Sequence, residues 1–465
     1  MDLRCLKKLC NYGVFPNSDE TAMDWCDSEP YIFRIVVVLC FTSAGAVPCF
    51  AQLQDRAAPP LNHPAILYRT GPLADPVSVL DAKLQLGTAR LQFEGPQGYL
   101  RSVLEALKVP IESQVAVFSK TSLQADLIEP GNPRTIFFND SVSVAWMHGG
   151  FIELASHDPQ RGVIFYTLSQ QETYKPRFQR RDDCLRCHIS QASLDVPGMI
   201  IRSMFTASDG TPRMILGASL IDHRSPVEDR WGGYYVTGAS GVVRHMGNAF
   251  VTNEDHPMSM VSDTTLKLSS LDRKFDTRNY LSPYSDVAAL MVFDHQMYMN
   301  SLITRVGWEI RAALYKDGHT RLFDLATLLR ETAEEFVDYL FFIDEAPLSG
   351  AIVEDTSGSP KKPSAKFAER FAAQGPRDGK GRTLRDLDLK SRLLRYPCSY
   401  MIYSDAFEAL PAQAKDAIYK RMWQVLSGAV QEEKYARFTL ADRRAIVEIL
   451  RDTKKGLPDY FQPVK

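Results

Sequence analysis

Residues 199–221 have the sequence MIIRSMFTASDGTPRMILGASLI. Two apolar segments, Met199–Phe205 and Met214–Ile221, lie on either side of a Ser-Asp-Gly turn at residues 208–210. Short apolar runs that flank an Asp-Gly turn predict a β-hairpin. The hairpin places β-structure in the middle of the chain, so an all-helical fold is not expected.

A second strand pair is expected further along the chain. Tyr234–Thr237 and Val242–Met246 are separated by a turn with a glycine at each end, residues 238–241. Together with the first hairpin, this pair predicts a β-rich block over residues 180–280. Such a block resembles the PAS or Cache type of sensor scaffold.

The preceding region, residues 52–179, is predicted to mix helices and strands. His148 and His157 stand beside turn residues in this region and are expected to be solvated. Apolar spacing indicates short helices, and alternating or continuous β-branched runs indicate strands. The helices are expected at 77–86 and 99–107, and the strands at 115–118, 135–138, 142–147 and 163–168.

The second half of the chain is predicted to be helical. In the region 281–353, a helix ending at Leu314 is expected to begin with Ser282 as its N-cap and Pro283 at its first position. Residues 354–383 are rich in Ser, Pro, Gly and Lys and predict a linker or long loop. A C-terminal helical region, 384–465, follows. The expected fold class is therefore α+β.

Just before the first hairpin, Cys184, Cys187 and His188 form a C-x-x-C-H sequence. Two thiols at this spacing can add to the vinyl groups on one edge of a porphyrin, and the imidazole that follows lies under the iron as its proximal axial ligand. C-x-x-C also occurs in zinc sites and in redox-active dithiols. We expect one covalent haem c; the alternative is a Cys/His zinc site that recruits Cys398.

The segment 1–51 is expected to be a signal peptide region. An apolar run, Ile35–Thr42, follows Arg34 and precedes small residues, which allows cleavage after Ala46 or Ala51. The run is shorter than the roughly 20 residues that span a bilayer. We therefore expect an exported, periplasmic protein with no stable membrane span after cleavage. Translation starts at Met1 or Met23, and the sequence leaves both open.

Charge and cysteine content exclude some other classes of protein. The formal net charge of −2 gives no general affinity for nucleic acid. If cleavage follows Ala51, the mature chain keeps Cys184, Cys187 and Cys398, too few for a disulfide framework. Cys398 is expected to be a buried small hydrophobe. The chain has a single C-x-x-C-H sequence and is expected to be monohaem.

Through Cys184, Cys187 and His188 the chain resembles the c-type cytochromes. The resemblance covers the attachment motif, and it implies two thioether bonds, a proximal histidine, haem loading outside the cytoplasm and a role in electron transfer. More loosely, the segments DHRSPVEDRWGGYYVTG (222–238) and RHMGN (244–248) are similar to those of uncharacterised exported bacterial proteins with a cytochrome c domain. That similarity implies no particular activity.

The distal axial ligand determines the chemistry of the iron. A methionine raises the reduction potential and suits electron transfer, a histidine lowers it, and an open position allows ligand binding or peroxide chemistry. The sequence favours the adjacent pair His245 and Met246, of which only one can face the haem if both lie on a strand. The other candidates are Met199, His223, His295 and no protein ligand at all.

The motif admits three functional classes. The favoured one is an electron carrier or electron acceptor that meets a redox partner protein in the periplasm. The others are a peroxidase-like haem enzyme, for which Arg202, Arg244 or His245 could line an open distal site, and a haem-based sensor. A basic approach to the motif is expected to hold a haem propionate or to dock the partner; it consists of Lys175, Arg177, Arg180 and Arg181.

Overall fold

The computed structural model describes residues 56–239, 243–315, 322–348, 350, 352 and 363–464. The predicted signal peptide region, 1–51, lies outside the described residues. Among those that are described, no helix combines the length and the apolar character needed to cross a bilayer. The fold is α+β: a large antiparallel sheet with short helices in the first half of the chain, and a helical second half.

A seven-stranded sheet with the order β6-β5-β4-β3-β2-β1-β9 forms the first layer, and every neighbouring pair in it is antiparallel. The strands predicted for the N-terminal region are confirmed, and β4 is an additional one. The strands are β1 (Val115–Val117), β2 (Arg134–Phe138), β3 (Val142–Trp146), β4 (Ile152–Asp158), β5 (Gly162–Leu168), β6 (Gln179–Arg180) and β9 (Tyr234–Tyr235).

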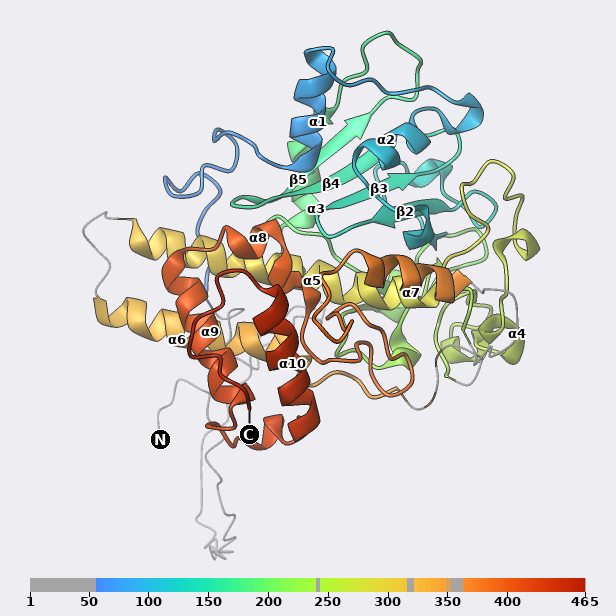
Figure 1. Ribbon diagram of the computed structural model, residues 1–465. Coiled ribbons are helices and arrows are strands. Elements are labelled where there is room, and N and C mark those ends of the chain that lie inside the picture. The colour runs from blue at the N-terminus through green and yellow to red at the C-terminus, as the bar shows by residue number, and fades with distance from the viewer. Residues whose placement is uncertain are drawn as a thin grey trace, which may run out of the picture. The chain divides into compact units, whose positions relative to one another are not determined.

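Two helices cover one face of this sheet, as the sequence predicted. They are α1 (Pro76–Gln85) and α2 (Leu100–Ala106). Asp75 caps α1 by accepting hydrogen bonds from two backbone amides in its first turn, and it also accepts one from the Tyr166 hydroxyl of β5 at 2.8 Å. Apolar side chains of both helices and of the strands form one core. Figure 1 shows α1 and α2 lying against the sheet.

The opposite face of the sheet packs against α5 (Val287–Leu314), a helix of 28 residues. On β4, His157 projects from this face, and its Nε2 lies 2.9 Å from Oγ1 of Thr304 on α5. The expectation that His157 is solvated is therefore wrong. Every residue of α5 from Val287 to Met297 is buried, because the sheet lies on one side of the helix and the C-terminal helices lie on the other.

The predicted N-cap of α5 is wrong. The helix begins at Val287, and Asp286 is its N-cap: one carboxylate oxygen accepts hydrogen bonds from the amides of Ala288, at 2.8 Å, and Ala289. Ser282 instead closes a local turn, in which its hydroxyl accepts a hydrogen bond from the Tyr284 amide. A carboxylate at the N-cap also interacts favourably with the helix dipole, which a serine hydroxyl does less well.

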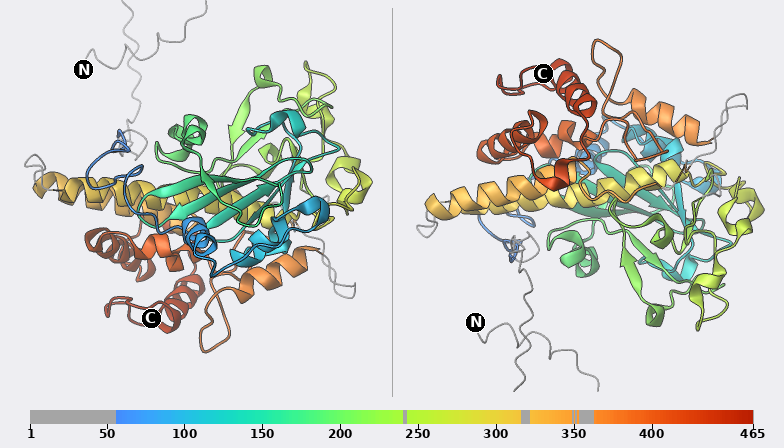
Figure 2. Two further views of the ribbon diagram at one scale, coloured as in Figure 1. Left: turned by 90° about the horizontal axis from the view of Figure 1, so that it is seen from above. Right: turned by 90° about the horizontal axis from the view of Figure 1, so that it is seen from below.

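The remaining helices of the second half continue the core around α5 (Figure 2). A capping box begins the last helix, with Thr439 as N-cap and Asp442 as its partner. The helices are α6 (Leu322–Leu340), α8 (Asp405–Glu408), α9 (Ala412–Leu426) and α10 (Leu440–Thr453).

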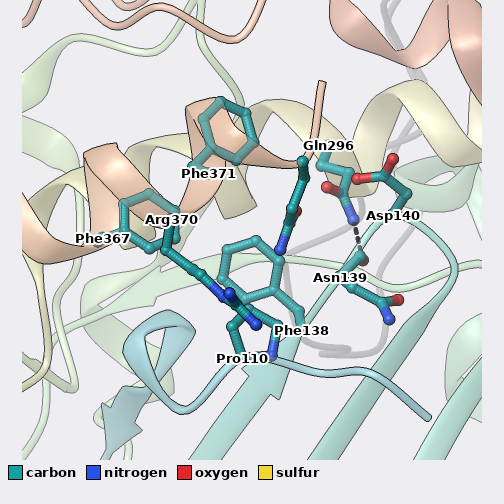
Figure 3. A pocket seen from close by; sticks show the side chains of 9 residues that line it. Pro110, Phe138, Asn139, Asp140, Gln296, Phe367, Arg370 and Phe371 are labelled. Carbon is teal, nitrogen blue, oxygen red and sulfur yellow. Dashed lines mark hydrogen bonds between the residues drawn. The ribbon is translucent and has the colours of Figure 1, made fainter. Parts of the chain in front are cut away.

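The prediction of a linker over 354–383 is wrong for Pro363–Ala373, which forms helix α7. Phe367 and Phe371, one turn apart, are both buried in the core. Figure 3 shows them beside Phe138 of β2, whose ring centroid is 6.3 Å from that of Phe367. The cavity drawn there has a volume of about 10 Å³, room for a single water molecule.

The first predicted hairpin is confirmed, in shorter form. Its strands β7 (Arg202–Met204) and β8 (Ala218–Leu220) make a separate two-stranded sheet. The block 180–280 otherwise contributes only β6 and β9 among its described residues, so the large sheet belongs mainly to the preceding region. The likeness to a PAS or Cache scaffold stays a prediction.

The second predicted hairpin is wrong, because β9 pairs with β1 and the residues from 243 to 246 form no strand. The side chain of Asn248 takes the place of a partner strand. Its oxygen accepts a hydrogen bond from the Val236 amide at 2.7 Å, and its amide group donates to the Val236 carbonyl at 2.8 Å.

Candidate functional site

The C-x-x-C-H sequence folds into a compact helical turn that follows β6. Cys184 ends a short 3-10 segment, and α3 (Leu185–His188) continues it. Leu185 is buried and anchors the turn, whereas Cys187 is exposed and Cys184 is half-buried. Side chains three residues apart lie on the same side of a helical turn. Both thiols are free, so they remain available to bind one group together.

His188 is held by two reciprocal contacts with Gly198. Its ring Nδ1 lies 3.0 Å from the Gly198 carbonyl oxygen, and the Gly198 amide donates to the His188 carbonyl at 3.1 Å. The ring also packs on Phe165 of β5, with a centroid distance of 4.7 Å. Among the described residues, the ring of His188 makes its hydrogen bond through Nδ1, and none to Nε2 is found. A ring that donates from Nδ1 to a carbonyl presents a neutral Nε2 that can bind a metal.

The electrostatic environment keeps this imidazole neutral. Burial lowers the pKa of His188 below its usual value, and the cations Arg134 and Arg202 lower it further, although the hydrogen bond to Gly198 opposes them. A histidine must be deprotonated to bind iron. Near neutral pH, His188 is therefore ready to act as an axial ligand.

The cysteine pair does not have the character of a redox-active dithiol. Burial, and then the nearby Asp183 carboxylate, raise the pKa of the Cys184 thiol to about 11. Reactive C-x-x-C dithiols depend on a lowered thiol pKa.

The structure also gives no support to the zinc alternative. The described residues contain no group of three or more His, Cys, Asp or Glu side chains that could hold a metal ion. Cys398, which a zinc site would have to recruit, is fully buried in the hydrophobic core around α5, as expected for a small apolar residue.

A cavity with a volume of about 190 Å³ adjoins the motif segment. It lies between the turn that follows His188, the chain after Gly198, the end of β8 and helix α5. Most of its lining is apolar, and its charged side chains are Asp222 and Arg224, which form an ion pair at 2.5 Å. The lining residues are Gln191, Ala192, Met199, Ile200, Ile201, Leu220, Ile221, Asp222, Arg224, Met297 and Tyr298.

Two of the four basic residues that precede the motif form ion pairs with the aspartates that follow them. Arg180 donates from Nε to Asp182 at 2.8 Å, and Arg181 donates to both carboxylate oxygens of Asp183. These arginines are neutralised by the aspartates that follow them. Lys175 and Arg177 lie on the exposed part of the same segment.

The favoured distal candidates, His245 and Met246, make their contacts away from the motif residues. His245 is buried, its Nδ1 accepts a hydrogen bond from the Gly247 amide at 3.1 Å, and its Nε2 is buried without a partner. The Met246 sulfur accepts from the Ser203 hydroxyl at 3.6 Å. No hydrogen bond or ring contact among the described residues joins either side chain to His188. Distal ligation by His245 or Met246 stays a prediction.

The other candidates occupy two different places. His223 and His295 form a buried pair with their Nδ1 atoms 2.8 Å apart, and Nε2 of His295 lies 2.7 Å from the Ser399 hydroxyl. Met199 follows Gly198 and lines the cavity beside the motif.

Sequence reasoning missed the residues that support His188. Gly198 and Phe165 carry no motif, and only the folded chain brings them to the imidazole ring. The sequence suggested Arg202 only as a lining residue of the open distal site in the enzyme alternative. A Pro-Gly sequence at 197–198 was a visible signal of a special backbone, but not of its partner.

Comparison of the chain with protein-family models, with curated proteins and with solved structures finds no match. The class of site is therefore defined by the motif and its geometry alone.

Proposed function

We propose that this chain is an exported monohaem c-type cytochrome that carries or accepts electrons through a haem bound to Cys184, Cys187 and His188. The observation that carries the proposal is the state of His188. Its Nδ1 is held by a backbone carbonyl at 3.0 Å, its ring is packed on Phe165, and no hydrogen bond to its Nε2 is found among the described residues.

The residues present fit a covalently attached haem. Two free thiols on one helical turn supply the attachment, and a neutral imidazole supplies the proximal ligand. When bound, the group supplies one-electron chemistry at iron. The protein's part is to hold the imidazole in one orientation through Gly198 and to tune the iron through that hydrogen bond.

Exposure of the motif supports an electron carrier in preference to an enzyme. Cys187 is exposed and α3 lies at the surface, so a group tethered there has an edge within reach of a redox partner protein. Export to the periplasm belongs to the same proposal, because haem c is attached outside the cytoplasm. The peroxidase-like and sensor alternatives both require an iron with an open distal position.

Spectroscopy of the haem-loaded protein tests the proposal. We expect a low-spin, six-coordinate iron in both oxidation states, negligible binding of carbon monoxide at neutral pH, and reversible one-electron titration. Alanine at both His245 and Met246 is expected to produce a high-spin form if that segment supplies the distal ligand. A native high-spin ferrous protein that binds carbon monoxide and turns over peroxide would contradict the carrier function.

A further inference from the structure

The β7–β8 hairpin carries apolar side chains that the protein leaves uncovered. Met214, Ile215 and Leu220 are exposed by 61, 86 and 53 %. All three residues of β8 are exposed. A two-stranded sheet is marginal in water unless its apolar surface is covered. We therefore expect a ligand or partner to cover these exposed apolar side chains of the hairpin.

The exposed hairpin reaches the segment that follows the C-x-x-C-H motif. Leu220 and Ile221 at the end of β8 line the same cavity of about 190 Å³ as Gln191 and Ala192, which come just after His188. Figure 2 shows the motif turn, in green, and the hairpin, in yellow-green, on the same side of the large sheet. Residues that follow the motif and residues at the end of β8 thus line one cavity.

The hairpin also supplies an available cation. Arg202 of β7 is directly opposite Leu220 in the strand register. Its guanidinium is exposed and has neither a hydrogen bond nor an ion pair among the residues that the structure describes. Three other arginines near the motif are already paired: Arg180 with Asp182, Arg181 with Asp183, and Arg134 with Glu153. Arg186, inside the motif, is also exposed, but it lies on α3 and not on the hairpin.

We propose that the β7–β8 hairpin is the second wall of the haem site, where Leu220 packs on the macrocycle and Arg202 pairs with a propionate. A haem combines a flat apolar ring with two carboxylates, and this strand pair offers an apolar side chain beside a free guanidinium. The proposal rests on the haem attachment proposed above. It moves the propionate contact from the basic segment before the motif to the hairpin after it.

Five single variants of the haem-loaded protein test this assignment. Two are Arg202→Gln and Leu220→Ser. Their matched controls are Arg213→Gln, an arginine of the same hairpin that is paired with Glu254, and Leu440→Ser, a leucine exposed by 46 % at the start of α10. Arg202→Lys keeps the charge and serves as the conservative variant. The measurements are haem content, and reduction potential as a function of pH.

We expect all five variants to retain covalent haem. Arg202→Gln is expected to lower the reduction potential and to bring a propionate titration into the neutral range, because the propionate loses its cation; Arg202→Lys is expected to restore most of the wild-type profile. Leu220→Ser is expected to lower the potential by admitting water to the ring. The two controls are expected to match the wild type.

The two proposals fail in distinguishable ways. Wild-type protein without haem would contradict the proposed function itself. Haem-loaded wild type whose Arg202→Gln and Leu220→Ser variants keep the potential and pH profile of the controls would overturn the hairpin assignment alone. The assignment is also overturned if Leu220→Ser instead dissociates a dimer in gel filtration and leaves the potential unchanged, since the hairpin would then be a contact between copies of the chain.

Discussion

Gly198 is the residue on which the orientation of His188 depends. A Cβ atom at this position would meet the Ser301 hydroxyl oxygen of α5 at 2.4 Å. We expect Gly198→Ala to displace the carbonyl from Nδ1 of His188 and to destabilise the fold by roughly 1–3 kcal/mol, the usual cost of overpacking. Denaturant unfolding gives the stability, and the reduction potential of the loaded protein reports on the imidazole.

Ser301→Ala provides the matched rescue for Gly198→Ala, because it removes the oxygen that the new methyl group meets. The double variant is expected to recover part of the stability and of the wild-type potential. Equal stability of the single and double variants would show that the close contact with Ser301 does not restrict this position.

His157 gives a prediction about pH. Burial lowers its pKa to about 4, although Asp158 opposes the shift. Below pH 6.5 the unfolded chain takes up a proton at this residue and the folded protein does not, so stability is lost as the pH falls from about 6.5 towards 4. His157→Gln is expected to remove roughly 3 kcal/mol of this loss. Chemical unfolding at neutral pH and near pH 4 measures it; equal losses in both proteins would contradict the burial of His157 in its neutral form.

For single residues, the sequence predicts the chemistry of a side chain better than it predicts the neighbours of that side chain in the fold. Cys184, Cys187 and His188 are recognisable because their spacing matches a chemical requirement. The partners of His188 are not, because Phe165 and Gly198 become its neighbours only through β-sheet register and loop closure. The same limit explains why His157, beside turn residues in sequence, lies in the strand β4 and faces α5.

Among the helices, the N-terminal boundary of α5 can be tested directly. Asp286→Ala removes a carboxylate that accepts two amide hydrogen bonds at the N-terminus of the helix. Loss of such a cap costs about 0.5–2 kcal/mol. Ser282→Ala is the matched control, because the sequence favours Ser282 as the cap and the structure does not. Thermal unfolding that ranked Ser282→Ala as the more destabilising variant would contradict the assigned helix start.

Regular elements were predictable where local pattern and tertiary environment agree. Strands β1, β2, β3 and β5 and helices α1, α2, α9 and α10 carry clear apolar periodicity. Strand β4 was missed because polar Glu153, Ser156 and His157 interrupt its pattern, and each is satisfied by a distant partner. Helix α7 was missed because two phenylalanines in a polar segment are a weak signal, although both are buried in the fold.

For the whole molecule, the fold class was predictable from the sequence, but which part of the chain builds the large sheet was not. The α+β assignment is confirmed, but the large sheet precedes the motif instead of following it. The motif turn therefore packs on a sheet built by another part of the chain, through the contact of His188 with Phe165. This arrangement supports the His188 ring on the sheet, while the end of the β7–β8 hairpin lines a cavity together with Gln191 and Ala192, which follow the motif.

The central claim is that one haem is attached through Cys184 and Cys187 with His188 below the iron. Intact mass measurement of protein exported with haem-loading machinery, after acid–acetone extraction, tests it most directly. We predict the mass of the chain plus one haem in the wild type, and the bare chain for Cys184→Ala combined with Cys187→Ala. Wild-type protein that has the bare chain mass, no Soret band and stoichiometric zinc would contradict the account.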